Sequence, residues 1–180
     1  CRLDYPAPPP GGVVVDVGAN LGISAAWFLT RRRDSRVVAF EPDPRNLPRL
    51  EANLAPFAGR WRLEPVALAL QDGEAGFAIE ASGRYGRLSE QPFASVESEV
   101  IRVRCSALDA ALREVLAREG RIDVLKLDVE GWEAVLLAAL PPDLLPRIGV
   151  VAAEGRFPDI ALPGFRASER GGVTVFRRTG

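Results

Sequence analysis

Residues 13–17, VVVDV, form an apolar run that is interrupted only by Asp16. Such a run is typical of a strand buried on both faces, because a strand with one solvated face alternates apolar and polar residues. The turn GANLG follows at residues 18–22, and ISAAWFLTRRR at residues 23–33 has the pattern of a helix packed on a sheet. A doubly buried strand needs strands beside it and helices on both faces, so this segment constrains the fold most.

The same succession of strand and helix continues along the chain. Further strands are expected at residues 36–40, 61–70, 76–80, 100–105, 122–127 and 147–153. Further helices are expected within residues 41–54 and at residues 106–120 and 131–140, and a hairpin around Gly171-Gly172 follows. Pro65 places the third strand toward a sheet edge, and Ser106 with Asp109 has the spacing of a capping box. The pattern predicts an α/β fold with a mostly parallel sheet, helices on both faces and a C-terminal antiparallel hairpin.

The chain has the length of one ordinary domain. Residues 1–12, which end in PAPPPGG, lack periodicity and are expected to be a linker or a remnant. Residues 13–180 are expected to form a single domain. Within it, the Ser-, Gly- and Glu-rich residues 81–99 are expected to be a loop that acts as a lid or substrate loop.

Composition excludes several classes of function. A net charge of −1 argues against a nucleic-acid binder that relies on a basic field. No apolar run approaches the ~18 residues of a membrane span, and no signal peptide is recognisable, so we expect no membrane partner. Two isolated cysteines fit a reducing compartment, and we expect a cytoplasmic protein. The absence of histidine excludes histidine bases and histidine-ligated metals in this chain, and no metal is expected. There is also no methionine, and we expect the sequence to be a piece of a longer product.

In sheets of this kind ligands bind at the carboxyl ends of the strands. That rule selects residues 16–22, 41–43, 68–72 and 128–130 together with Glu154.

The first turn points to a cationic ligand. The dinucleotide fingerprint G-x-G-x-x-G fails, because the spacing here is Gly18, Asn20, Gly22. Asp16 just before the turn would repel a pyrophosphate, whereas it would attract an ammonium or a sulfonium. Glu41, at the end of the second strand, is placed to accept hydrogen bonds from ribose hydroxyls. Together these residues favour S-adenosylmethionine over a nicotinamide dinucleotide.

The segment VLKLDVEGWE, residues 124–133, raises a separate question. Lys126, Asp128 and Glu130 alternate with apolar residues, as in a half-solvated edge strand with a mutually neutralising ion network. A strand that lies between two helices in this pattern is normally central and buried, and its charges then need partners or a ligand.

Four segments resemble the FkbM-type methyltransferases in order and spacing. They are VVVDVGANLGISAAWFL, VVAFEPDPRNLPRLEANL, VALALQDGEAGF and IDVLKLDVEGWEAVLL, and together they span roughly residues 13–154. The resemblance implies a class I methyltransferase (Rossmann-like) sheet, S-adenosylmethionine as donor, and O-methylation of a hydroxyl on a sugar or natural product. A histidine that often appears near the end of the strand carrying Glu154 is absent, since the chain reads VVAAEGRF.

The cofactor-binding candidates are given roles on this basis. We expect Gly18 to let the backbone approach the methionine portion of the donor, and Asp16 to hold the loop or accept from the ammonium group. Asp72 is either turn chemistry or a contact to the adenine amino group. The full set of candidates is Asp16, Gly18, Asn20, Gly22, Glu41, Asp72 and Asp128.

The base is expected to be a carboxylate, Lys126 or a water held by one of them, because no histidine is available. Asp128 and Glu130 are the carboxylate candidates, and Lys126 could instead bias their charge or orient a small-molecule hydroxyl acceptor. The alternatives to a methyltransferase are a non-catalytic S-adenosylmethionine-binding domain and an NAD-dependent oxidoreductase.

Overall fold

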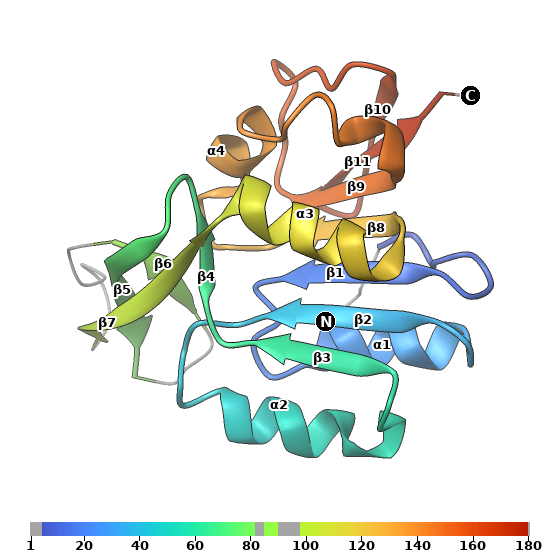
Figure 1. Ribbon diagram of the computed structural model, residues 1–180. Coiled ribbons are helices and arrows are strands. Elements are labelled where there is room, and N and C mark those ends of the chain that lie inside the picture. The colour runs from blue at the N-terminus through green and yellow to red at the C-terminus, as the bar shows by residue number, and fades with distance from the viewer. Residues whose placement is uncertain (1–4, 82–84, 90–97, 180) are drawn as a thin grey trace.

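The structure is a computed structural model that describes residues 5–81, 85–89 and 98–179. Its larger sheet has the strand order β10-β11-β9-β8-β1-β2-β3. All neighbouring strands run parallel except at β11, which is antiparallel to both β9 and β10. The predicted α/β fold, with a mostly parallel sheet and a C-terminal antiparallel hairpin, is confirmed (Figure 1). The strands are β1 (Val13–Val17), β2 (Arg36–Phe40), β3 (Trp61–Glu64), β8 (Ile122–Leu127), β9 (Ile148–Glu154), β10 (Phe165–Arg170) and β11 (Val173–Arg178).

Helices cover both faces of this sheet, as the doubly buried strands require. The helices are α1 (Ile23–Arg31), α2 (Leu47–Leu54), α3 (Leu108–Glu119) and α4 (Glu133–Ala138), with 3-10 turns at Ala55–Phe57 and Leu145–Arg147. Val14 faces one core with α1 and α2, whereas Val15 and Val17 face the other core with α3 and α4. Since neighbours along a strand point to opposite faces, Asp16 lies on the face that α1 covers. None of the helices in the described ranges combines the length and hydropathy needed to cross a membrane.

A second, four-stranded sheet was not anticipated. It has the order β4-β7-β5-β6, with β4 (Ala67–Ala69), β5 (Gly73–Glu80), β6 (Gly86–Leu88) and β7 (Ser98–Ala107). The expected strand 61–70 is divided at Pro65, so that β3 joins the edge of the large sheet and β4 pairs with β7. Proline has no N–H to continue a ladder, which explains the break. Figure 1 shows the second sheet beyond the arrowheads of β1, β2 and β3, where the carboxyl ends of the strands point.

Several expected boundaries differ. The helix expected at 106–120 begins at Leu108, and Ala107 occupies its N-cap without a side-chain hydrogen bond, so the capping box at Ser106 is wrong. Gly120 ends this helix in a left-handed conformation, as expected. The loop expected at 81–99 contains β6 and the start of β7, and its residues 82–84 and 90–97 lie outside the described residues.

Candidate active site

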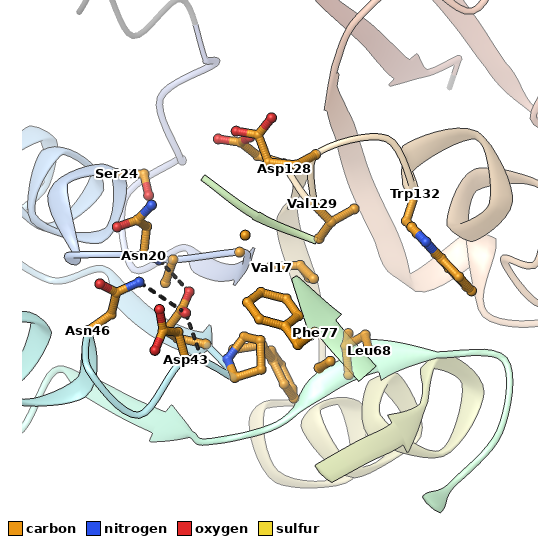
Figure 2. Close-up of a pocket in the computed structure, with 18 of the residues that line it drawn as sticks. Val17, Asn20, Ser24, Asp43, Asn46, Leu68, Phe77, Asp128, Val129 and Trp132 are labelled. Carbon is orange, nitrogen blue, oxygen red and sulfur yellow. Dashed lines mark hydrogen bonds between the residues drawn. The ribbon is translucent and has the colours of Figure 1, made fainter. Parts of the chain in front are cut away.

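A cavity of about 420 Å³ lies at the carboxyl ends of β1, β2 and β8. The large sheet supplies its polar side, and β5, β6 and the segment around β4 supply an apolar wall. Figure 2 shows Asp128 on one side of this cavity and Asp43 and Asn46 on the other, with Phe77 between them. The polar lining side chains are Asn20, Ser24, Glu41, Asp43, Asn46, Lys126, Asp128, Glu130 and Glu154; larger apolar ones include Val17, Phe40, Val66, Leu68, Phe77, Leu88, Val129 and Trp132.

The turn after β1 is held by its own backbone. The amides of Gly18 and Ala19 both donate to the carbonyl of Phe40 at 3.0 Å, which ties the turn to the end of β2. Gly18 has a φ of +74°, and a Cβ there would lie 1.8 Å from the carbonyl oxygen of Asp128. Glycine is therefore required for the turn to pack on the Asp128 backbone. The approach of a ligand to Gly18, which lines the cavity, stays a prediction.

The other two predicted residues of the turn also have left-handed backbone. Asn20 has a φ of 51° and lines the cavity. Gly22 has a φ of +77° and is the N-cap of α1; a Cβ there would meet Leu50 and Leu54 of α2 at 3.1 and 3.3 Å. Gly22 therefore allows the close approach of the two helices rather than that of a ligand.

Glu41 joins the ends of β1 and β2. Its Oε2 accepts from the Asn20 amide at 2.7 Å, and its Oε1 accepts from the Asp43 amide at 2.9 Å. Burial raises the pKa of Glu41, and the hydrogen bonds from Asp43, Asn20 and Asn46 oppose that shift. Each carboxylate oxygen has two lone pairs, so Glu41 retains acceptor capacity toward the cavity that it lines.

The position of Lys126 shows whether its alternating segment is a half-solvated edge strand or a buried central strand. β8 lies between β1 and β9, and Lys126 is 1% exposed, so its charge is not on a solvated face. Its Nζ lies 2.8 Å from Asp16 Oδ1 and 2.8 Å from the Gly18 carbonyl, and Asp16 Oδ2 accepts from Ser24 at 2.6 Å. Asp16 therefore holds the loop, which is one of its two predicted roles.

The same ammonium group reaches the cavity. Lys126 Nζ lies 3.3 Å from Asp128 Oδ2. Burial alone would lower the pKa of Lys126, but the Asp16 and Asp128 carboxylates raise it, and the net shift is upward. A lysine that stays protonated cannot take a proton from an acceptor. The raised pKa argues against Lys126 as the base, and its orienting role stays a prediction.

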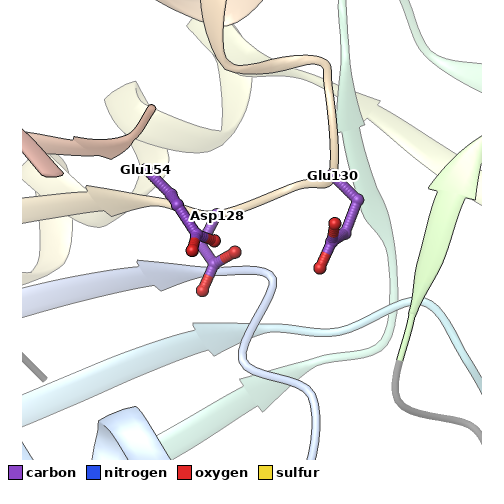
Figure 3. Close-up of side chains that lie close together, drawn as sticks. All are labelled: Asp128, Glu130 and Glu154. Atoms are coloured by element: carbon purple, nitrogen blue, oxygen red, sulfur yellow. The ribbon is translucent and has the colours of Figure 1, made fainter. Parts of the chain in front are cut away.

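Three carboxylates converge at this end of the cavity. Oxygens of Asp128, Glu130 and Glu154 lie within 4.8 Å of one another (Figure 3). Glu130 follows β8 with a φ of 53°, a conformation that L residues rarely adopt, and Glu154 ends β9. Acidic groups often gather without a cation, and nothing else in the described residues points to one, so the absence of a metal stays a prediction.

The surroundings separate the pKa values of these groups. Burial alone would raise the pKa of Asp128, but Lys126 and hydrogen bonds with Glu154 and Tyr5 lower it, and the net shift is downward. The hydrogen bond to Asp128, followed by burial, raises the pKa of Glu154 to about 8. Burial, followed by the charge of Asp128, raises the pKa of Glu130 to about 7. Near neutral pH the group thus contains one ionised carboxylate and two that hold protons readily.

Three of the predicted cofactor-binding residues do not line this cavity: Asp16 and Gly22, whose contacts are described above, and Asp72. Asp72 Oδ1 accepts from the Ala107 amide at 2.8 Å, just ahead of α3, and Asp72 lines a neighbouring hollow instead. This geometry fits the alternative of local turn chemistry, and the contact to an adenine amino group stays a prediction.

Sequence reasoning missed several lining residues. Trp132 lines the cavity, and its Nε1 donates to the Leu88 carbonyl of β6 at 3.1 Å. Phe77, Tyr85 and Leu88 come from the second sheet or its connection. The signal for Phe77 was the apolar alternation of GFAIE, residues 76–80, which predicts a strand without indicating its partner; Tyr85 and Leu88 lie outside that segment.

The charges of the site fit S-adenosylmethionine. Among the described residues, the lining carries five carboxylates and a single basic side chain, Lys126, which is already paired. A cationic sulfonium and its ammonium group are attracted by such a lining, whereas a pyrophosphate is repelled. Glu41 lines the cavity with acceptor oxygens, and its contact with ribose hydroxyls stays a prediction. The apolar wall has the character needed to cover an adenine ring.

Comparison with known proteins decides the family. A family model described as the methyltransferase FkbM domain matches residues 16–154. The chain belongs to this family. Relatives of this family and fold use S-adenosylmethionine as methyl donor.

Two of the relatives that the chain matches are named as methyltransferases. The chain is 38% identical to the 2-O-methyltransferase NoeI of Sinorhizobium fredii, covering 72% of this chain and 57% of NoeI. It is 30% identical to the 31-O-demethyl-FK506 methyltransferase FkbM of Streptomyces tacrolimicus, covering 92% of this chain and 74% of that protein. The chain spans less than two thirds of the length of NoeI, and 8% of another, much longer relative.

Solved structures share the fold. A putative caffeoyl-CoA O-methyltransferase from Staphylococcus aureus matches with a TM-score of 0.54 at 11% identity, covering 94% of this chain and 76% of that one. The predicted class I methyltransferase fold is therefore confirmed.

Proposed function

We propose that this chain is an S-adenosylmethionine-dependent O-methyltransferase that acts on a hydroxyl of a sugar or natural product. The observation that carries the proposal is the meeting of three carboxylates with the donor turn in one cavity. Both named relatives support oxygen as the accepting atom, since their names specify 2-O- and 31-O-methylation.

The donor is held by residues at the ends of β1, β2 and β8. Glu41 accepts from the ribose hydroxyls, and the turn from Gly18 to Asn20 lies against the methionine portion. Asp128 supplies negative charge close to the reacting end of the cavity. When bound, S-adenosylmethionine supplies a methyl group already activated by the sulfonium charge. The residues of this chain then need to orient the hydroxyl, exclude water and remove one proton.

Glu130 is the base that the geometry favours. Among the described residues it makes no hydrogen bond or ion pair, whereas Asp128 Oδ2 is already engaged by Tyr5 and Lys126. A pKa of about 7 is matched to proton transfer near neutral pH, and the lowered pKa of Asp128 makes it a weaker base. The acceptor oxygen loses its proton to Glu130 as it gains the methyl group, and Asp128 remains ionised throughout.

The test is transfer of a labelled methyl group from S-adenosylmethionine to a panel of glycosides and polyketide-like alcohols. With an acceptor in hand, Glu130→Gln is expected to lower kcat by about 100-fold or more, as for loss of a general base. Glu51→Gln, which changes an exposed carboxylate on α2, is the matched control and keeps full activity. Retained turnover in both Asp128→Asn and Glu130→Gln would show that neither carboxylate is the base.

The same experiment addresses the rival function. A non-catalytic binding domain would bind S-adenosylhomocysteine and transfer no methyl group to any member of the panel. That outcome would contradict the proposed methyl transfer and would support the proposed donor-binding site.

A further inference from the structure

Tyr5 lies in the segment that sequence patterning treats as a linker, yet it belongs to the core. It is 8% exposed, and its ring centroid lies 6.0 Å from that of Phe28 on α1. Residues 5–12 lead from Tyr5, next to the carboxyl end of β8, to Gly12 at the amino end of β1. The segment therefore runs along the sheet against the strand direction and brings Tyr5 to the candidate active site.

The hydroxyl of Tyr5 has a specific partner there. It donates to Asp128 Oδ2 at 3.2 Å, and Lys126 Nζ lies 3.3 Å from the same oxygen. Lys126 Nζ also lies 5.8 Å from the centroid of the Tyr5 ring. Burial raises the pKa of Tyr5, and the charges of Asp128, Asp16 and Glu154 raise it further, so the hydroxyl keeps its proton and acts as a donor.

Two donors on one carboxylate oxygen restrict how the carboxylate can turn. Asp128 would otherwise rotate about its terminal torsion, which is broad for aspartate. Lys126 holds Oδ2 from the sheet and Tyr5 holds it from residues 5–12, so both contacts act on the same oxygen of Asp128. Asp16 fixes Lys126 through a fully buried ion pair, and Lys126 in turn contacts Asp128.

We propose that Tyr5 is a positioning residue: its hydroxyl and the ammonium of Lys126 together hold the Asp128 carboxylate in place at the reacting end of the cavity. This inference rests on the proposed function, in which Asp128 provides negative charge beside the donor sulfonium. It adds a residue outside the segment that the family model matches.

Two donor analogues make the test independent of the unidentified acceptor. S-adenosylhomocysteine is neutral at the reacting centre, whereas sinefungin carries an amino group in place of the methylsulfonium. Tyr5→Phe removes only the hydroxyl and keeps the ring that packs on Phe28. We expect Tyr5→Phe to lower the affinity for sinefungin, measured by calorimetry, about 5-fold, because the variant loses a hydrogen bond to the charged Asp128 carboxylate. S-adenosylhomocysteine binding should stay within about twofold, since its contacts are elsewhere.

Ser35→Ala is the matched control for loss of a buried hydroxyl. Ser35 is 0% exposed and donates to the Arg32 carbonyl at 3.0 Å, next to the amino end of β2 and away from the cavity. The control should lower thermal stability and leave the ratio of the two affinities unchanged. In an Asp128→Asn background, Tyr5→Phe should have no further effect on that ratio, because its partner charge is gone.

The outcomes separate the two claims. Equal weakening of both analogues by Tyr5→Phe, or an undiminished effect in the Asp128→Asn background, would mean that Tyr5 acts through packing alone. Wild-type protein that binds neither analogue would overturn the proposed function and this inference together. Tight wild-type binding with an unchanged ratio in Tyr5→Phe would overturn the inference alone.

Discussion

Replacement of Gly18 by alanine tests how the turn after β1 packs on Asp128, in the segment between β8 and the candidate base Glu130. The new Cβ would lie 1.8 Å from the Asp128 carbonyl oxygen, whereas real Cβ contacts essentially never fall under 3.0 Å. The obstacle is backbone of the end of β8, so a side-chain rotation cannot relieve it. Two costs result: about 1–2 kcal/mol for a left-handed alanine, and about 1–3 kcal/mol or more for overpacking.

Gly59→Ala isolates the first of these costs. Gly59 has a φ of +79°, and a Cβ there meets nothing within 4 Å. The free energy of unfolding, measured by urea titration, should fall in both variants, and by about 1–3 kcal/mol more in Gly18→Ala. The new Cβ of Gly18→Ala forces the backbone of the donor turn away from Asp128. This variant should therefore also weaken S-adenosylhomocysteine binding, whereas Gly59→Ala should leave that binding intact. Equal losses of stability in the two variants would refute the packing argument.

Other predictions concern the charges of the site. Lys126→Met should lower the free energy of unfolding by about 3–5 kcal/mol, because it leaves Asp16 buried without its partner; adding Asp16→Asn should recover part of the loss, and no recovery would argue against the pair. Asp72→Ala should cost about 1 kcal/mol by loss of its hydrogen bond at the start of α3, with unchanged S-adenosylhomocysteine affinity; weakened binding would return this residue to the donor site. Glu130 and Glu154 release protons near 4.5 in the unfolded chain but near 7 and 8 in the fold. The folded state therefore binds more protons between these values, and the free energy of unfolding should fall as pH rises from about 5 to 8. In the variant with both Glu130→Gln and Glu154→Gln, urea titrations should show a free energy of unfolding that depends less steeply on pH. A steeper dependence on pH would contradict these pKa shifts.

Local pattern was enough to predict the large sheet. VVVDV is an apolar run of strand length interrupted only by Asp16, whereas IDVLKL is a strand-length segment between two helical patterns, and both form central strands. The apolar side chains of a strand and the helical patterns on either side of it are local features of the sequence. A strand buried on both faces can therefore be predicted without knowledge of distant residues. The same reasoning placed Asp128 and Glu130 at the carboxyl edge, because they follow the last buried residue of β8.

What could not be predicted depends on contacts distant in sequence. β4 pairs with β7 across more than 30 residues, and no local feature of Ala67–Ala69 selects that partner. Asp72 accepts from the Ala107 amide, which lies near it only because β4 pairs with β7. Tyr5 has no periodic neighbours, so its hydrogen bond to Asp128, 123 residues away, has no signal in the sequence.

The central claim is that the cavity is a site for a nucleoside donor without phosphates. The most direct measurement is calorimetric titration with S-adenosylhomocysteine and, separately, with NAD. The account predicts saturable binding of S-adenosylhomocysteine, weakened at least about tenfold by Glu41→Ala, and no binding of NAD. Binding of NAD with no response to S-adenosylhomocysteine would contradict it.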